Sequence, residues 1–140
     1  MNLRTITIDD YDNLIAFWKK NYFVRGIDSP DRFKLFLEKN ADLSILAEEN
    51  GEIVGTILVS FDGRRGYLQK LVVRENLRGT GIGKQLVAEA VKRLTSLGVL
   101  YIPIAVEEKN IAFYTSCGFK VNDQVAMSKE VSQHEYIKDY

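Results

Sequence analysis

Three alternating glycines stand near the middle of the chain, in the stretch Arg-Gly-Thr-Gly-Ile-Gly at residues 78–83. An apolar run precedes this stretch and an amphipathic helical pattern follows it, so the glycines fall at a strand-to-helix junction. Glycine tolerates a positive φ and lets a bulky anion approach the backbone. The start of a helix adds unpaired N–H groups and the positive end of the helix dipole. With its flanking arginine, the stretch predicts a binding site for a phosphate group.

The spacing of the glycines excludes two common nucleotide-binding motifs. A Rossmann motif counted from Gly79 needs its third glycine at position 84, which is Lys84. A P-loop needs Ser or Thr after the Gly-Lys pair and a glycine five residues before that pair's glycine, but the chain has Gln85 and Arg78 there. A purely structural glycine turn stays an alternative on these six residues alone.

Two motifs together resemble the GNAT N-acetyltransferase superfamily. The pattern R-x-x-G-x-G at residues 78–83 resembles the acetyl-CoA pyrophosphate loop of that family, and F-Y-x-x-x-G-F at residues 113–119 resembles its later helix. The order of the expected elements is similar over essentially the whole chain. The resemblance implies an α/β (α+β) fold in one domain of residues 1–140, with a mostly antiparallel sheet, one splayed parallel strand pair and helices on both faces.

The same resemblance implies acetyl-CoA as the acyl donor and a set of cofactor-binding residues. Backbone N–H groups of the glycine loop hold the pyrophosphate, with added charge from Arg78 or Lys84; an ordinary solvated helix residue is an equal alternative for Lys84. The main chain of residues 71–73 pairs with the pantetheine arm as an added strand would. The set comprises Leu71, Val72, Val73, Arg78, Gly79, Thr80, Gly81, Ile82, Gly83, Lys84 and Asn110.

Asn110 departs from the family pattern. Many relatives carry an asparagine seven residues before the tyrosine of the later helix, but here that position is Glu107, and Asn110 lies four before Tyr114. Either the helix starts later with Asn110 as its cap, or Asn110 contacts the cofactor by a different route.

Transfer of an acyl group to an amine needs an oxyanion donor and a route for protons. In the family, a backbone N–H freed by a bulge, here near Val72 or Val73, stabilises the oxyanion, a donor worth ~2.7–4 kcal/mol. Tyr114 is the candidate acid for the departing thiolate, with a core aromatic residue as its alternative. The base is not assigned, because Glu107, Glu108 and a water relay are all candidates.

Further residues bear on the acceptor and on rival mechanisms. Gln69, where many relatives carry an acidic residue, cannot act as a base. Cys117 has no histidine near it in sequence, so we interpret it as a small buried hydrophobe and not as a nucleophile. The region that commonly shapes the acceptor site in this family contains Trp18, Tyr22, Phe23 and Arg25.

Hydrophobic periodicity gives the elements that must position these residues. Helices are expected over residues 10–21, 30–40, 82–97 and 109–117. Strands are expected over residues 3–8, 43–49, 52–61, 67–73, 99–106 and 124–131, with Asn50-Gly51 as a type I′ hairpin signal. The strand at 99–106 is expected parallel to that at 67–73. Residues 132–140 are expected as a loose polar tail.

Composition limits the remaining classes of function. The chain has 140 residues and a net charge of zero, so neither nucleic acid nor an acidic membrane is an expected partner. One cysteine and one histidine, His134, give no disulfide framework and no metal site. No leader is visible and no apolar run approaches ~20 residues, so a cytoplasmic location is expected.

The function expected from these patterns is acetyl-CoA-dependent N-acetylation of a primary amine. The amine, on a small molecule or a protein, would attack directly in a ternary complex. The alternative is a non-catalytic acyl-CoA-binding or regulatory module, which the residue at Gln69 and the position of Asn110 would suit. The oligomeric state is open, a homodimer included.

Overall fold

The computed structural model describes residues 1–131 and 136–137. Its elements are β1 (Asn2–Thr5), η1 (Ile8–Asp10), α1 (Tyr11–Asn21), β2 (Val24–Arg25), η2 (Gly26–Asp28), α2 (Pro30–Lys39), β3 (Ile45–Glu49), β4 (Glu52–Phe61), β5 (Gly66–Val73), η3 (Glu75–Leu77), α3 (Ile82–Thr95), η4 (Glu108–Asn110), α4 (Ile111–Ser116) and β6 (Tyr136–Ile137). The main sheet is antiparallel with the order β1-β3-β4-β5. The expected helices and the first four expected strands are therefore confirmed, with small differences at their ends.

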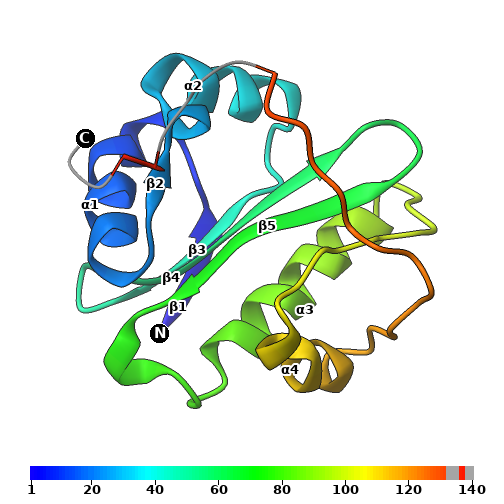
Figure 1. Cartoon of the computed structure of the whole chain (residues 1–140). Helices are drawn as coiled ribbons and strands as arrows, with labels where there is room; N and C mark the ends of the chain where they lie inside the picture. Colours follow the sequence, from blue (N-terminus) through cyan, green and yellow to red (C-terminus); the bar gives the residue numbers. More distant parts are fainter. Residues whose placement is uncertain (132–135, 138–140) are drawn as a thin grey trace.

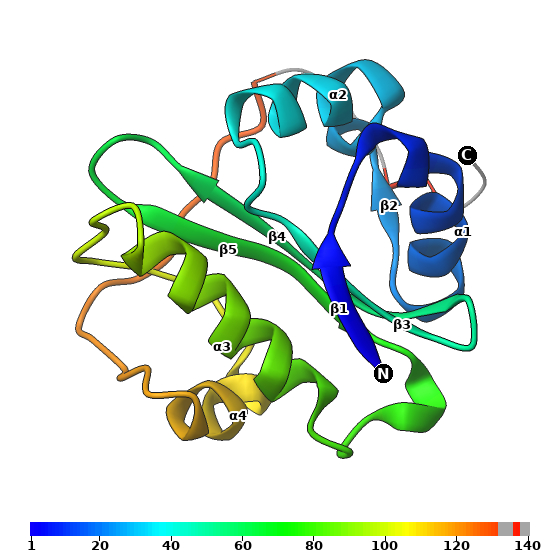
Figure 2. The ribbon, with the colours of Figure 1, turned by 180° about the vertical axis from the view of Figure 1, so that it is seen from behind.

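Helices cover both faces of this sheet, as expected. α1 and α2 lie on one face, and α3 and α4 lie on the other (Figures 1 and 2). Two clusters of buried residues follow this division. One joins the sheet to α3 through residues such as Leu86 and Leu94, and the other joins it to Leu14 and Trp18 of α1 and to Phe33 of α2. Packed side chains on both faces of the sheet therefore hold β5, the strand that leads into the glycine loop.

Local sequence signals account for the turn and for the close packing of α3. Asn50 and Gly51 have φ values of 54° and 77°, which a type I′ hairpin requires at both positions. A Cβ at Gly55 would lie 2.9 Å from Leu86 Cδ1 and 3.0 Å from Ile82 Cγ2. The missing side chain of Gly55 therefore lets α3 lie directly against β4.

Residues 99–106 form no regular strand, so this prediction was wrong, and the parallel pair with β5 is absent from the described sheet. The segment runs back from the end of α3 to α4 (Figure 1). Gly66 N–H donates to Tyr101 O at 3.1 Å, but Pro103 has no N–H to continue a ladder. Val99 is buried and Ile102 packs against the α3 cluster. The apolar side chains of this segment thus pack against α3, while its backbone joins no sheet.

The strand expected over residues 124–131 is also absent from the described structure, and this prediction was wrong. Val125 and Met127 are 85% and 94% exposed, so these apolar side chains cover no sheet face. A strand needs a neighbouring strand to pair with, and residues 99–106 cannot be that neighbour because they do not form a strand themselves.

The C-terminal stretch is described only in part. Tyr136–Ile137 pairs antiparallel with Val24–Arg25, so the tail contacts the connection between α1 and α2 at that point. Residues 132–135 and 138–140, which include His134, lie outside the described residues. Among the described helices, every one is too short or too polar to cross a lipid bilayer.

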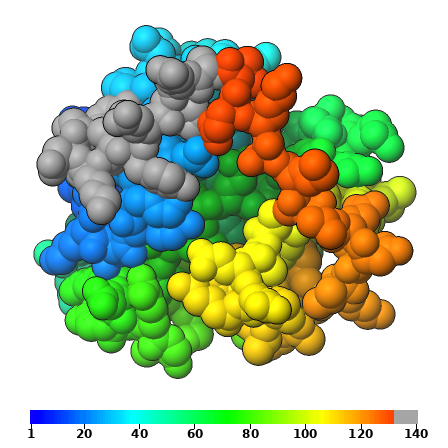
Figure 3. Space-filling model, viewed as in Figure 1, coloured from blue at the N-terminus to red at the C-terminus, as the bar shows by residue number. Residues whose placement is uncertain are grey.

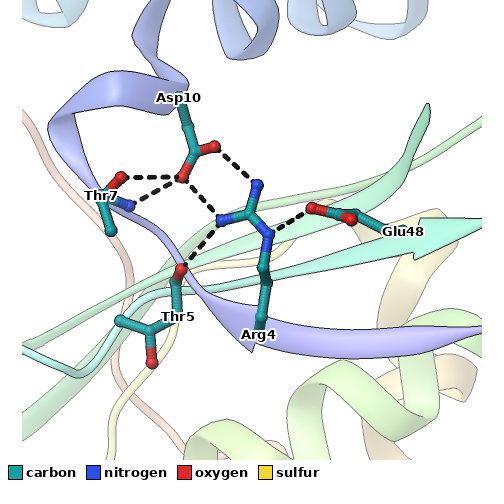
Figure 4. Close-up of polar contacts among 5 residues, drawn as sticks. All are labelled: Arg4, Thr5, Thr7, Asp10 and Glu48. Carbon is teal, nitrogen blue, oxygen red and sulfur yellow. Dashed lines mark hydrogen bonds and ion pairs between the residues drawn. The ribbon is translucent and has the colours of Figure 1, made fainter. Parts of the chain in front are cut away.

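A charged network fastens β1 to its neighbours (Figure 4). Arg4 donates from Nη2 to Asp10 Oδ1 at 2.7 Å and from Nη1 to Asp10 Oδ2 at 2.9 Å, and its Nε contacts Glu48 of β3. The Thr7 N–H also donates to Asp10 Oδ2, at 2.8 Å. Burial alone would raise the pKa of Asp10, but the hydrogen bonds from Arg4 and Thr7 outweigh it and hold the pKa below its ordinary value.

Asp10→Asn is expected to lower the free energy of unfolding by about 1–3 kcal/mol at pH 7, because a buried charged acceptor is lost. Since the folded pKa is depressed, the stabilisation by the carboxylate is complete above the ordinary pKa of ~3.9 and is lost as pH falls through the folded pKa. Urea unfolding at pH 7, 5 and 3 checks this, with the exposed Asp123→Asn as control. If Asp10→Asn lowers the free energy of unfolding by the same amount at all three pH values, the charge of Asp10 does not have this role.

Candidate active site

The candidate site residues lie around the free edge of β5. β5 is the last strand of the sheet order, so its outer backbone groups face no further strand of the described sheet. Figure 3 shows a hollow over the green of β5, between the blue atoms of the α1–β2 region and the yellow and orange atoms of the segments around α4. A cavity of about 490 Å³ adjoins this edge and is lined by Tyr67, Ile104 and Tyr114 among others.

A bulge interrupts β5 beside this hollow. Thr56 lies opposite Val72 and Leu58 opposite Gln69, so Lys70 and Leu71 together face one residue of β4. Lys70 has a φ of 52°, in the left-handed region. Such an extra residue reorients the backbone groups of a strand and is common next to active sites. The bulge that the family resemblance implied is present.

The bulge and the ladder determine which backbone groups of β5 face the free edge. Arg74 N–H donates to Val54 O at 2.9 Å, so the alternation of an antiparallel ladder turns the N–H of Val73 away from β4. The N–H of Val72, one residue earlier, points toward β4, where Val72 pairs with Thr56. Of the two donors expected for an oxyanion, Val73 therefore lies at the open edge. The side chains of Leu71, Val72 and Val73 pack in the two core clusters, so only their main chain is available.

The glycine loop presents a row of unpaired N–H groups at the head of α3. The N–H groups of residues 79–84 donate to no acceptor among the described residues; the next one, of Gln85, donates to Gly81 O at 3.1 Å. Gly79 and Gly81 have φ values of 81° and 94°, and no atom lies within 4 Å of where their Cβ atoms would be. Their role is therefore to allow the left-handed backbone conformation of this loop. These residues fit a diphosphate.

The side chains around the loop differ in their partners. Arg78 donates from Nη2 to Asn21 O at 3.0 Å and from Nε to Val73 O at 3.4 Å, so its guanidinium joins the loop to the ends of α1 and β5. Thr80 Oγ1 donates to Leu77 O at 2.5 Å. Lys84 is exposed on the first turn of α3, while Ile82 and Gly83 are buried. Arg78 and Lys84 both add positive charge beside the row of donors.

We expect Arg78→Ala to weaken acetyl-CoA binding roughly tenfold, because the loop loses one charge and the contacts that hold its conformation. Isothermal titration calorimetry measures the dissociation constant. The exposed Arg64→Ala in the β4–β5 hairpin is the control and should leave that constant unchanged. An unchanged constant for Arg78→Ala would remove this arginine from the binding site.

Helix α4 brings Tyr114 to the other side of the site. A Cβ at Gly83 would lie 3.2 Å from Phe113 Cζ, so α4 packs close to the head of α3. The Tyr114 ring contacts Phe113 and Phe119 edge-on, at centroid distances of 5.0 and 5.8 Å. Burial, with smaller contributions from Cys117 and Tyr22, raises the pKa of Tyr114 above its ordinary value. Its hydroxyl is therefore protonated at neutral pH, as a proton donor must be.

The remaining predicted site residues lie around α4 and on β5. Asn110 occupies the N-cap position of α4, but its side chain makes no capping hydrogen bond, and it is exposed. Glu107 and Glu108 are exposed, and Glu107 pairs with Lys109 at 3.5 Å. Gln69 is exposed one residue before the bulge. The helix does start late, at Ile111, as one of the two interpretations of Asn110 expected.

Sequence reasoning missed Lys70 and Thr56. Thr56 Oγ1 donates to Lys70 O at 3.0 Å and accepts from Trp18 Nε1 at 2.9 Å, so a buried hydroxyl holds the bulge to α1. The signal in the sequence was a single lysine inside the apolar run of β5. A charged residue at such a position indicates a break in strand pairing or a buried partner.

Solved structures share this fold over most of their length. PaiA N-acetyltransferase from Thermoplasma acidophilum, solved in complex with coenzyme A, matches with a TM-score of 0.77 and 20% identity, over 89% of this chain and 92% of that one. Glucosamine-6-phosphate N-acetyltransferase from Arabidopsis thaliana matches with a TM-score of 0.73 and 23% identity, over 94% and 98%. A protein from Clostridium acetobutylicum described as a predicted acetyltransferase, solved with acetyl-CoA, matches with a TM-score of 0.70 and 20% identity, over 91% and 95%. The chain therefore has the same fold as these solved proteins.

The family follows from the sequence comparisons. The model of the acetyltransferase (GNAT) family matches residues 11–119. An acetyltransferase of Pectobacterium atrosepticum is 30% identical, over 97% of this chain and 100% of that protein. The chain belongs to the acetyltransferase (GNAT) family, whose acyl donor is acetyl-CoA.

Proposed function

We propose that this protein transfers the acetyl group of acetyl-CoA to a primary amine, by direct attack of the amine in a ternary complex. The row of unpaired N–H groups at residues 79–84, directly after a bulged edge strand, carries this proposal. A diphosphate at that row would place the rest of the cosubstrate along the free edge of β5. The family membership supports acetyl transfer, and the N-acetyltransferases among the structural relatives support an amine as the acceptor.

Each part of the site has a role in this reaction. The N–H groups of the loop, with Arg78 and Lys84, hold the pyrophosphate, and the main chain of β5 pairs with the amide groups of the pantetheine arm. The N–H of Val73 donates to the oxygen that gains charge when the thioester is attacked. The Tyr114 hydroxyl gives its proton to the departing thiolate. Acetyl-CoA supplies the activated acyl group.

Proton removal from the acceptor is assigned to water. An amine with a pKa of ~10.4 is mostly protonated at neutral pH and must lose a proton before it attacks. Glu107 and Glu108 are exposed near the start of α4, and Gln69 carries no charge. A chain of water molecules through the open hollow can take the proton to solvent without a dedicated carboxylate.

A thiol-release assay with acetyl-CoA tests the proposal. The acceptors would be polyamines, amino sugars, amino acids and peptides with free α-amines, each at several concentrations, and mass spectrometry would identify the amide formed. Turnover on at least one amine is expected, with the intersecting double-reciprocal lines of a ternary-complex mechanism. Micromolar binding of acetyl-CoA without turnover on any acceptor would contradict the proposal and favour an acyl-CoA-binding module.

A further inference from the structure

The ammonium group of Lys70 is buried next to the bulge of β5. Its side chain is only 10% exposed. The Nζ atom donates to Phe23 O at 2.7 Å and lies 3.1 Å from Asp28 Oδ2. It also lies 5.0 Å from the ring centroid of Trp18, 5.2 Å from that of Tyr22 and 4.8 Å from that of Phe23. A carboxylate, a carbonyl and three aromatic faces therefore surround one nitrogen.

These neighbours stabilise the ammonium form of Lys70. Both oxygen atoms are acceptors, so they need N–H donors, and an aromatic face attracts a cation within about 6 Å. Burial lowers the pKa of Lys70, while Asp28 opposes this shift and Arg25 adds to it. Because its N–H groups are directed at the Phe23 carbonyl and the Asp28 carboxylate, we assign Lys70 a positioning role and not the role of a base.

The contacts of Lys70 join two parts of the site that are far apart in sequence. Its backbone forms the bulge, in a left-handed conformation that is uncommon for a residue with a side chain. Its ammonium holds the connection between α1 and α2, where Asp28 also accepts from the Arg25 N–H at 2.9 Å. This connection borders the hollow over β5, where the blue atoms of the α1–β2 region lie opposite the yellow atoms near α4 (Figure 3). The connection is thus one wall of the hollow.

We propose that Lys70 is a positioning residue for the acceptor: its ammonium clamps the connection between α1 and α2 to the bulge of β5 and so fixes the wall against which the amine lies. This inference rests on the proposed function, because it assigns that wall to the acceptor. The clamp acts through Asp28 and the carbonyl of Phe23, and it sets the distance between the wall and the backbone donors of β5. The proposed contacts of acetyl-CoA are with the backbone of β5 and of the glycine loop, so its affinity is expected to depend little on the Lys70 side chain.

Two substitutions remove the ammonium in different ways. Lys70→Met keeps most of the apolar stem, whereas Lys70→Gly removes the side chain and suits the positive φ of the bulge. Both are expected to raise the acceptor KM at least fivefold, measured with the fastest amine of the panel above, while the acetyl-CoA dissociation constant stays within twofold. The exposed Lys92→Met is the control. If Lys70→Met fails to fold, Lys70→Gly carries the test.

A double-substitution cycle with Asp28→Asn tests whether Lys70 acts through Asp28. Asp28→Asn alone should raise the acceptor KM, and Lys70→Met with Asp28→Asn should raise it no further than Lys70→Met does. Fully additive effects would overturn the proposal. So would an acceptor KM within twofold of the wild type in the Lys70 variants, or an equal loss of acetyl-CoA binding.

A third readout separates this proposal from the proposed function. Arg25 is a trypsin site within the clamped connection, and limited proteolysis should cut there at least fivefold faster in Lys70→Met than in the wild type. If the wild type turns over no amine, the proposed function fails by itself and this cleavage rate decides the clamp. Equal rates in wild type and variant would overturn the clamp even if the enzyme is active.

Discussion

Tyr114→Phe is expected to lower kcat by about 100-fold while the KM for acetyl-CoA changes less than threefold. The phenyl ring keeps the edge-on contacts with Phe113 and Phe119, so the packing of α4 is retained. Only the hydroxyl is lost, and with it the proton for the thiolate. Steady-state kinetics on the best acceptor measures both constants.

Tyr67→Phe is the matched control for this prediction. Tyr67 lines the same cavity, but its hydroxyl donates to Asp62 in the exposed hairpin at 3.0 Å. Its loss should leave kcat within twofold of the wild type. Equal kcat values for Tyr114→Phe and the wild type would show that Tyr114 is a core aromatic residue and that the thiolate is protonated by another group.

Gly81→Val is expected to weaken acetyl-CoA binding by at least tenfold. Gly81 has a φ of 94° at the N-cap of α3, and a β-branched residue in that conformation is a strong outlier. The backbone would turn to relieve this strain, and the unpaired N–H groups after it would no longer point to one place. Calorimetric titration with acetyl-CoA measures the change.

Gly63→Val is the control that distinguishes a specific loss of the binding site from a general effect of backbone strain. Gly63 has a φ of 96°, and like Gly81 it has no atom within 4 Å of where its Cβ would be. It lies in the β4–β5 hairpin, at the opposite end of β5 from the loop. Both variants should lose similar thermal stability, but only Gly81→Val should lose cofactor binding. Similar losses of binding in both would indicate a general effect on the fold.

Sequence reasoning succeeded where local chemistry decides the structure. Asn50-Gly51 specifies a turn with two positive φ values, and Ser29-Pro30 specifies the start of α2. The apolar stripe of α3 placed that helix correctly, and the glycines before it marked the loop. In each case, residues close in sequence contain the whole signal.

It failed where the structure depends on distant partners. Residues 99–106 have the composition of a strand, but their apolar side chains pack on α3 and their backbone forms no ladder with β5. The strand expected over 124–131 depended on that ladder and is absent with it. The contacts of Lys70 with Trp18 and Asp28 join residues from three separate stretches of the chain, and no periodicity reveals them.

In the proposed function, backbone N–H groups at the head of α3 hold the diphosphate of the cosubstrate. Titration of the ¹⁵N-labelled protein with coenzyme A, followed by amide chemical shifts, tests it most directly. The largest shifts are predicted at residues 79–84, with smaller ones at Leu71 and Val73. Saturable binding of coenzyme A that leaves the amides of residues 79–84 unshifted would contradict it.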